Sequence, residues 1–324
     1  MKNLASKIEH LHNKKVLVIG DTILDVNTES IPLGFSAETP TFKAEQTQTT
    51  PLLGGAGNVA SHVSSLGANC TFLTVGGKDS DSSTIKDLGC SQQNLTTILL
   101  EVESRKTCVK HRFWVERNGV SYKYFQLNKT ENSPIDEDTK NRIFQIIEDE
   151  KFDTVVLSDY RLGIFADRDF TERVIRKLRN KGVYVLANGQ ASNTKFDYQK
   201  FLGVDTLVLN ENESLIMLDQ YDDKHPDMTS LSRVIEARIC VTSGDRGANL
   251  YEKGSVFYSP AIKVSDLDTC GAGDAFLACF SLLDKDLPPD EKLSIANTWA
   301  ALSTTKLGTE TPSIRTFFDA LGEK

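Results

Sequence analysis

Residues 268–280 read Asp-Thr-Cys-Gly-Ala-Gly-Asp-Ala-Phe-Leu-Ala-Cys-Phe, a glycine-rich turn that leads directly into an apolar helix. The helix must be buried, and Gly271 and Gly273 allow the backbone before it to approach a ligand closely. Free N–H groups and the positive end of the helix dipole make this helix start suitable for binding phosphate. A bound phosphate would repel the negative charge of Asp274. A carboxylate at this position therefore indicates a catalytic role, such as accepting a proton from an attacking hydroxyl. The alternative is a simple turn in which Asp274 caps the helix.

Outside this turn, short apolar runs alternate with helical stretches. Such alternation predicts βαβ units and an α/β fold with a doubly wound, mostly parallel sheet that has helices on both faces. In sheets of this kind, ligands bind beyond the carboxyl ends of the strands. The expected strands are 14–20, 72–75, 154–157, 183–187, 206–209 and 239–242, and the clearest helices are 136–150, 169–181 and 230–236.

Two segments have a different pattern. Residues 40–50 and 106–127 alternate polar and apolar side chains, as antiparallel strands do when one face is wet. They predict a small antiparallel β-flap, a lid formed by about 34–50 and 105–128. No linker-like or repeated segment divides the chain, so we expect residues 1–324 to form a single domain.

Composition narrows the class of protein. The 324 residues are 39% hydrophobic and 25% charged, and 45 acidic against 37 basic residues give a net charge of −8, which argues against a nucleic-acid partner. No apolar stretch is long enough to span a bilayer, and the polar start lacks the core of a signal peptide, so we expect no membrane association and a cytoplasmic location. The six cysteines lack metal-site spacing and indicate free thiols.

The turn at 268–274 resembles the signature Asp-Thr-x-Gly-Ala-Gly-Asp of the ribokinase-like (PfkB) family of carbohydrate kinases, and the match is complete. The resemblance implies an ATP-dependent sugar kinase. Gly271, Ala272 and Gly273 would form the anion hole for the transferred phosphoryl group, and Asp274 would be the catalytic base. A second landmark of the family, Gly-Gly-x-x-x-Asn, is matched near the N-terminus, which implies substrate contacts from Gly54, Gly55 and Asn58.

Further matches extend the resemblance over nearly the whole chain. Asp21 and Asp25 correspond to acidic residues that bind sugar hydroxyls, although a turn and a helix cap would explain them equally well in isolation. An Asn-x-x-Glu motif implies a Mg²⁺ site at Glu213, held through water, and Mg²⁺ needs few protein carboxylates. The residues that the resemblance assigns to the nucleotide are Asn210, Glu213, Thr242, Gly244, Gly247 and Asn297.

Other classes of protein fit the sequence less well. The chain has no Walker A loop, and no G-x-G-x-x-G follows the first strand. Asp21 would stand where a nicotinamide oxidoreductase binds pyrophosphate, which disfavours that class. A non-catalytic sugar- or nucleotide-binding relative remains an alternative, against which the intact Asp274 and anion hole argue.

Three short strings resemble the bacterial kinases of D-glycero-D-manno-heptose 7-phosphate: 35–40, 107–112 and 158–160. They imply substrate contacts from Asp159 and from Lys110 and Arg112, which lie two residues apart on one strand face and would suit a phosphate already on the sugar. A solvated basic strand face is the alternative.

One segment departs from that branch. Residues 188–190 read Asn-Gly-Gln where the branch usually has Asp-Pro-Lys. Ribose, fructose or a hexose phosphate therefore remain alternative substrates. A homodimer through the β-flap is a further expectation.

Overall fold

A nine-stranded sheet forms the centre of the molecule. The computed structural model describes residues 4–192, 195–221, 227–265, 268–305 and 308–322. The strands of the main sheet follow the order β13-β12-β11-β10-β9-β8-β1-β4-β5, and all of its pairs are parallel except those that β12 makes with β11 and β13. They are β1 (Lys15–Gly20), β4 (Asn69–Gly77), β5 (Leu95–Val102), β8 (Thr154–Asp159), β9 (Tyr184–Gly189), β10 (Thr206–Asn210), β11 (Arg238–Thr242), β12 (Ala248–Glu252) and β13 (Ser255–Ser259).

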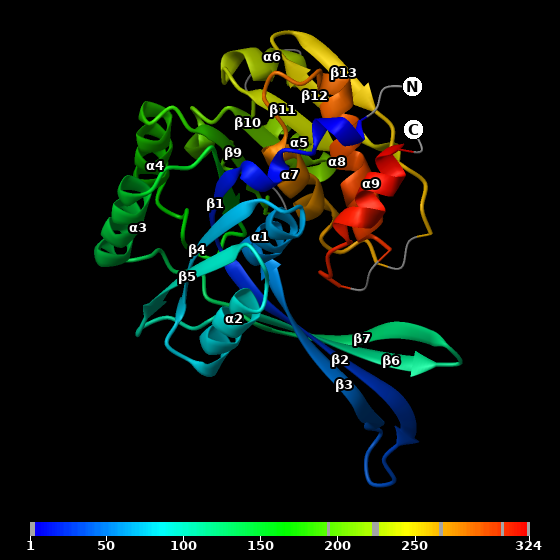
Figure 1. Cartoon of the computed structure of the whole chain (residues 1–324). Coiled ribbons are helices and arrows are strands. Elements are labelled where there is room, and N and C mark those ends of the chain that lie inside the picture. The colour runs from blue at the N-terminus through cyan, green and yellow to red at the C-terminus, as the bar shows by residue number, and fades with distance from the viewer. Residues whose placement is uncertain (1–3, 193–194, 222–226, 266–267, 306–307, 323–324) are drawn as a thin grey trace.

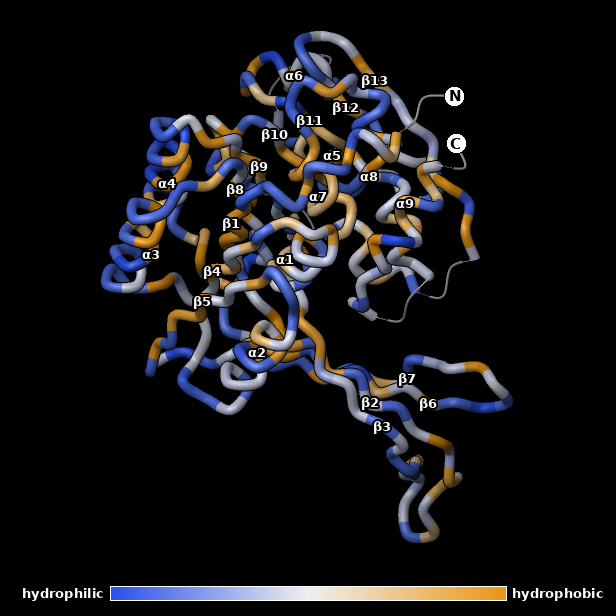
Figure 2. Tube along the Cα trace, in the orientation of Figure 1, coloured by the Kyte–Doolittle hydropathy of each residue, from blue (hydrophilic) through white to orange (hydrophobic). Residues whose placement is uncertain are grey.

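Helices cover both faces of this sheet, because its strands present apolar side chains to both sides. In β1, Val16 and Val18 pack into one core, and Leu17 and Ile19 pack into the other. Figure 1 shows the two helical layers, and Figure 2 shows hydrophobic residues concentrated in the strands between them. The first core includes residues of α1 (Ala56–Ser65), α2 (Ser80–Cys90), α7 (Ala272–Leu282), α8 (Pro289–Ser303) and α9 (Ile314–Gly322); the second includes residues of α3 (Glu137–Asp149), α4 (Arg168–Asn180), α5 (Glu211–Asp219) and α6 (Met228–Val234).

The predicted α/β class is confirmed, and each strand and helix predicted from the apolar runs is present within a few residues. The strands β5, β12 and β13 were not predicted; β5 and β13 are the two edges of the sheet, and β12 lies next to β13. An edge strand has a neighbour on one side alone and is less fully covered, so its apolar run is interrupted by polar residues.

A second, four-stranded sheet projects from the body as the flap (Figure 1). Its order is β3-β2-β6-β7, with strands β2 (Thr22–Phe35), β3 (Phe42–Gly55), β6 (Val109–Arg117) and β7 (Val120–Lys129). The two hairpins are antiparallel, whereas the central pair β2–β6 is parallel. The flap is therefore larger than the predicted segments, because β2 begins almost directly after β1 and places Asp25 on a strand instead of in a turn.

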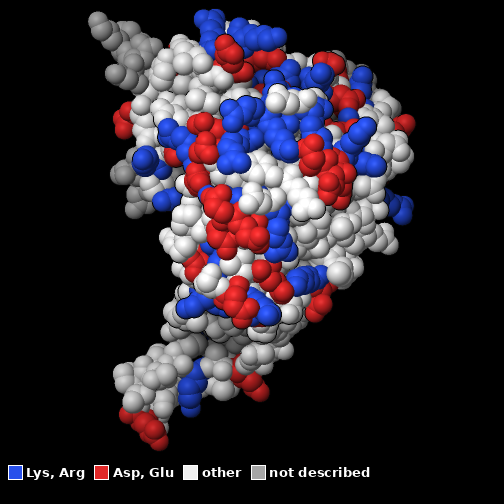
Figure 3. All heavy atoms as spheres, turned by 90° about the vertical axis from the view of Figure 1, so that its left-hand side faces the viewer, with Lys and Arg blue, Asp and Glu red and all other residues white. Residues whose placement is uncertain are grey.

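The predicted free thiols are confirmed, because none of the six cysteines forms a disulfide. On the face that carries α3 and α4, Lys and Arg are interspersed with Asp and Glu (Figure 3). Within the described ranges, each helix is too short or too polar to cross a bilayer.

Candidate active site

The start of α7 lies against α1 at the carboxyl ends of the central strands. Gly271 caps α7 with φ of +79°, and a Cβ there would lie 2.5 Å from Nδ2 of Asn58, so the left-handed turn and the close contact both require glycine. Asn58 is fully buried on α1, and its Nδ2 donates a hydrogen bond of 2.8 Å to Oδ2 of Asp274. The two motifs that were far apart in the sequence thus meet at this carboxylate.

Tyr160, just beyond β8, completes the surroundings of the predicted base. Its hydroxyl donates a hydrogen bond to Oδ1 of Asp274. Burial raises the pKa of Asp274 to about 6, and the nearby Asp25 carboxylate adds to the rise, while the bonds from Tyr160 and Asn58 and the charge of Lys110 oppose it. A carboxylate with this pKa is ionised at neutral pH yet basic enough to accept a proton, as a general base requires.

We expect Tyr160→Phe to move the acid limb of the pH profile of kcat/KM to higher pH. The phenol stabilises the ionised form of Asp274, so its removal raises the pKa of that carboxyl further above about 6. Activity should then fall more at pH 6 than at pH 8. The measurement is the pH dependence of initial rates, with Tyr122→Phe on the exposed part of the flap as the control. A uniform loss at every pH would contradict this role.

The second group of predicted residues lies on the flap side. Arg112 is buried, and its Nη1 donates to Oδ1 of Asp25 at 2.7 Å. Its Nη2 lies 3.9 Å from the sulfur of Cys270, a weak acceptor. A Cβ on Gly54 would lie 2.2 Å from Oδ2 of Asp25, so this glycine makes room for the carboxylate. Burial raises the pKa of Asp25, although the positive charges of Arg112 and Lys110 oppose the rise.

Lys110 and Gly55 belong to the same side of the site. Lys110 on β6 pairs in register with Asp25 on β2, and its charge reaches both Asp25 and Asp274. Gly55 ends β3, and a Cβ there would lie 2.5 Å from the carbonyl oxygen of Asp21. The flap strands thus bring one carboxylate and two cations towards the predicted base.

Asp21 has a different set of contacts from those expected for a sugar ligand. Its carboxylate accepts hydrogen bonds from the backbone N–H groups of Tyr160, Leu162 and Ile164 at 2.9–3.1 Å. Burial and the charge of Asp159 raise the pKa of Asp21 to about 7, against the effect of these three bonds. Asp21 therefore holds the loop that carries Tyr160.

Asp159 is likewise engaged by protein groups. Its carboxylate accepts bonds from Nζ of Lys200 and from the N–H of Arg161, the latter at 2.8 Å. Lys200 also donates to the carbonyl of Phe165 at 3.1 Å and is nearly buried. The strand β9 ends beside this pair, since the N–H of Gln190 bonds to the carbonyl of Asp159 at 3.0 Å. A lysine from a distant 3-10 helix thus supplies a positive charge close to the Asn-Gly-Gln segment.

The predicted nucleotide and metal residues follow β10 and β11. Asn210 and Glu213 form a capping box at the start of α5, in which each side chain accepts the other residue's N–H, at 2.9 and 2.8 Å. Burial raises the pKa of Glu213 to about 7, and the charge of Asp274 adds to the rise. A nearby cation would favour the ionised form of Glu213, and Mg²⁺ needs few protein carboxylates, so Asn210 and Glu213 could hold a Mg²⁺ ion.

The loop after β11 contains the remaining nucleotide candidates. Thr242 donates to the carbonyl of Leu209 at 3.3 Å, and Gly244 is exposed with φ of +56°, a left-handed conformation that favours glycine. Gly247 approaches the carbonyl of Ser259 so closely that a Cβ would lie 2.1 Å away. Nδ2 of Asn297 donates to the carbonyls of Ser259 and Pro260 at 3.0 and 3.2 Å, so its amide fixes the backbone at the end of β13.

Two residues of the site were not selected from the sequence as functional. Tyr160 follows a buried strand directly, and the rule that ligands bind beyond strand ends could have drawn attention to it. Lys200 carries no local signal, because its partner Asp159 is 41 positions away.

Comparisons with known proteins give the family of the chain. The family model described as "pfkB family carbohydrate kinase" matches residues 13–316. Two curated relatives are the "Bifunctional protein HldE" of Bradyrhizobium diazoefficiens, 29% identical over 315 residues, and that of Helicobacter pylori strain J99, 27% identical over 313 residues. These alignments cover 92% and 93% of this chain but 61% and 65% of the relatives, so the chain spans less than two thirds of their length.

Solved structures show the same fold at low sequence identity. Escherichia coli phosphofructokinase-2 in complex with fructose-6-phosphate has a TM-score of 0.75 and 16% identity, with 96% of this chain and 99% of that chain covered. The ribokinase of Thermotoga maritima has a TM-score of 0.70 and 20% identity, with 96% and 100% covered. With the family model matched over most of its length and both family motifs joined at Asp274, the chain belongs to the pfkB family of carbohydrate kinases.

Proposed function

We propose that this carbohydrate kinase transfers the γ-phosphoryl group of ATP to a hydroxyl of a sugar that already carries a phosphate. The observation that supports a phosphorylated acceptor is the buried Arg112 beside Asp25. One amino group of Arg112 binds Asp25, and the other faces a weak sulfur acceptor at 3.9 Å, which a phosphate oxygen would replace with a stronger bond. Lys110, on the same face of β6, adds a second cation.

The residues around Asp274 support in-line transfer. Asp274 would accept the proton of the sugar hydroxyl as that oxygen attacks phosphorus, while Tyr160 and Asn58 hold the carboxylate in place. The N–H groups of the Gly271–Gly273 turn would bind the phosphoryl oxygens, as the start of a helix does. Asp25 would orient the sugar by accepting a hydrogen bond from another hydroxyl.

Glu213 and Asn210 would hold Mg²⁺ near the ATP phosphates, and the ion would neutralise phosphate charge. The described ranges contain no group of three or more His, Cys, Asp or Glu side chains placed to hold a metal. Magnesium at Glu213 would therefore take its remaining ligands from water and phosphate, as is common for this ion. Thr242, Gly244 and Gly247 would line the nucleotide.

Our first choice of acceptor is D-glycero-D-manno-heptose 7-phosphate. The curated relatives are named "Bifunctional protein HldE", and their alignments cover 92% and 93% of this chain. The basic pair on β6 suits the phosphate of such a substrate. Ribose, fructose and hexose phosphates are the alternatives to be compared, because residues 188–190 differ from the usual Asp-Pro-Lys of heptose kinases.

The test is a panel of sugars and their phosphates, scored by ATP consumption, with wild type and Arg112→Ala. Loss of a charge-assisted contact of about 1.5–3 kcal/mol predicts a fall of roughly tenfold to a hundredfold in kcat/KM for the phosphorylated acceptor. The neutral parent sugar should lose much less. Lys110→Ala should behave in the same way, and Arg117→Ala, on the exposed end of β6, serves as the matched control.

Arg112→Lys separates charge from geometry, because Arg112→Ala also leaves Asp25 buried without its partner. The lysine variant should recover part of the activity towards the phosphorylated sugar. If the ratio of kcat/KM values for the two sugars does not change in any variant, the phosphosugar proposal is wrong and a neutral-sugar kinase takes its place.

We also propose a homodimer through the flap. Large apolar side chains lie exposed along it: Phe35 is 69% and Tyr124 is 60% exposed, and Ile31, Leu33, Tyr122, Phe125 and Leu127 are exposed as well. A second copy would cover this surface by the same patch in a two-fold arrangement. Sedimentation equilibrium should give twice the chain mass of 35.9 kDa, and Phe35→Ser with Tyr124→Ser should give a monomer. A monomeric wild type at micromolar concentration would contradict the proposal.

A further inference from the structure

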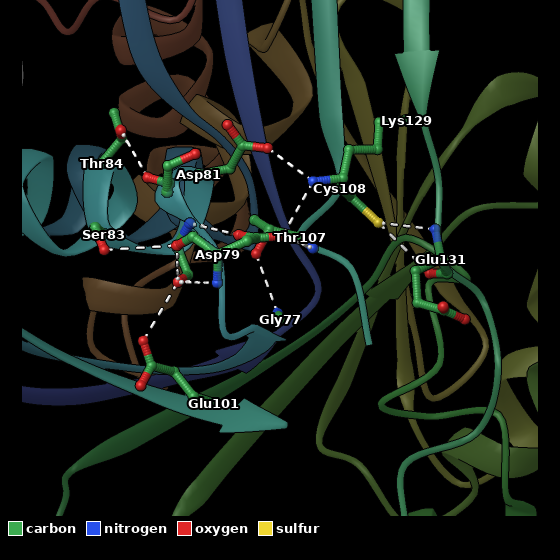
Figure 4. Close-up of polar contacts among 12 residues, drawn as sticks. Gly77, Asp79, Asp81, Ser83, Thr84, Glu101, Thr107, Cys108, Lys129 and Glu131 are labelled. Atoms are coloured by element: carbon green, nitrogen blue, oxygen red, sulfur yellow. Dashed lines mark hydrogen bonds and ion pairs between the residues drawn. The ribbon is translucent and has the colours of Figure 1, made fainter. Parts of the chain in front are cut away.

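Both ends of the hairpin β6–β7 are fastened to one helix start (Figure 4). Asp79, the N-cap of α2, accepts a bond of 3.0 Å from the N–H of Thr107, just before β6. Lys129, the last residue of β7, donates to Asp79 at 3.0 Å and to Asp81 at 2.8 Å. A single carboxylate thus contacts the first and the last part of the hairpin. We name Asp79, Asp81, Thr107 and Lys129 the root cluster.

Two further contacts close the root of the hairpin. Oγ1 of Thr107 accepts a bond of 3.0 Å from the N–H of Gly77 at the end of β4. The sulfur of Cys108 accepts the N–H of Glu131 at 3.2 Å and donates to its carbonyl oxygen at 3.5 Å. The strands therefore cannot separate at this end without breaking contacts to the body.

The helix that holds the root cluster is itself fixed to the main sheet. Ser82, which completes the capping box of Asp79, donates to Glu101 on β5 at 3.3 Å, and Lys86 of α2 bonds to the same carboxylate at 2.7 Å. Burial disfavours the charged form of Asp79, but the bonds from Thr107, Lys129 and Ser82 outweigh it and hold the pKa of this carboxyl well below its usual range. Asp79 is therefore ionised throughout the working range of pH.

The root cluster is close in sequence to the acceptor cations. Thr107 precedes Lys110 by three residues and Arg112 by five, and β6 is an extended strand over this distance. Lys129 pairs in register with Val109, directly next to Lys110. A displacement of the hairpin at the root cluster would move Lys110 and Arg112 relative to the two carboxylates of the site. These carboxylates, Asp25 and Asp274, belong to β2 and α7.

We propose that Lys129, held by Asp79 and Asp81, is a positioning residue that sets the place of Lys110 and Arg112 over the acceptor. The inference rests on the proposed acceptor role of these cations. An ordinary surface ion pair is the competing explanation, since such pairs contribute little to stability. The competing explanation predicts no change in acceptor binding when the ammonium group is removed.

The test compares Lys129→Met with wild type, because methionine keeps much of the length of the side chain and removes its charge. We expect the KM for the sugar phosphate to rise by about three- to tenfold, since small displacements of binding groups weaken productive contacts. The KM for ATP should change by less than about twofold. Lys129→Arg should restore most of the acceptor KM, because arginine can bind both carboxylates.

Lys78→Met is the matched control, as Lys78 lies beside the root cluster but forms an exposed ion pair with Glu103. It should leave both KM values unchanged. An unchanged acceptor KM in Lys129→Met, or equal rises for sugar phosphate and ATP, would overturn the proposal.

A second measurement does not depend on the identity of the substrate. In Lys129→Met, backbone amides of residues 108–113 and 125–129 should exchange with deuterium faster than in wild type, and those of β3 should not. If no sugar phosphate is turned over by wild type, the proposed function fails while this measurement still tests the root cluster. Unchanged exchange in the hairpin would overturn the positioning role on its own.

Discussion

Asp274→Asn is expected to lower kcat by about 10² to 10⁴, the usual contribution of a positioned general base. Asparagine has nearly the same shape, and its oxygen and nitrogen can still bond to Asn58 and to the Tyr160 hydroxyl. The affinity for ATP should therefore remain close to that of wild type. Initial rates at saturating substrates and a nucleotide titration measure the two quantities.

Asp319→Asn on the exposed side of α9 provides a control with the same chemical change far from the site. It should leave kcat unchanged. Turnover near the wild-type value in Asp274→Asn would remove this residue from the chemical step, whatever its contacts.

Gly273→Val should abolish most transfer without unfolding the protein. A Cβ at Gly273 has no atom within 4 Å, and the residue is exposed, so valine would project into the space where the transferred phosphoryl group should bind. Loss of a single oxyanion-type contact costs about 10²–10³ in rate, and a blocked site should cost at least about 10² in kcat/KM. The melting temperature should stay within a few degrees of wild type.

Gly271→Val gives the contrast two residues earlier. Its positive φ and the 2.5 Å approach to Asn58 mean that a side chain strains the turn and displaces the residue that holds Asp274. This variant should lose both activity and thermal stability. If Gly273→Val instead melts as far below wild type as Gly271→Val, the glycine at 273 is structural and the anion-hole assignment loses its support.

The parallel core of the fold could be predicted because its strands are buried on both faces. All six residues of Thr154–Asp159, for example, are buried, so a short and mostly apolar run is enough to predict this strand. The strand Thr22–Phe35 could not be found in this way. Its first half is buried and its second half is exposed on the flap, so no single period runs through it.

The sequence predicted those parts of the candidate site whose residues lie close together in the chain. The turn 268–274 carries the glycines and the predicted base within one short segment. The different contacts of Asp21 and Asp25 could not be predicted, because the sequence suggests the same role for both, binding sugar hydroxyls. The structure turns Asp21 towards the backbone of 160–164 and Asp25 towards Arg112, and this difference depends on partners 139 and 87 positions away.

The parallel pairing of β2 with β6 has a consequence for how the protein folds. Asp25 and Arg112 are separated by 87 positions, and Asn58 and Asp274 by 216. Closing loops of this length costs chain entropy before any contact is gained, so such contacts form late and slowly. The predicted catalytic centre therefore needs both long loops to be closed, and we expect activity to return late during refolding.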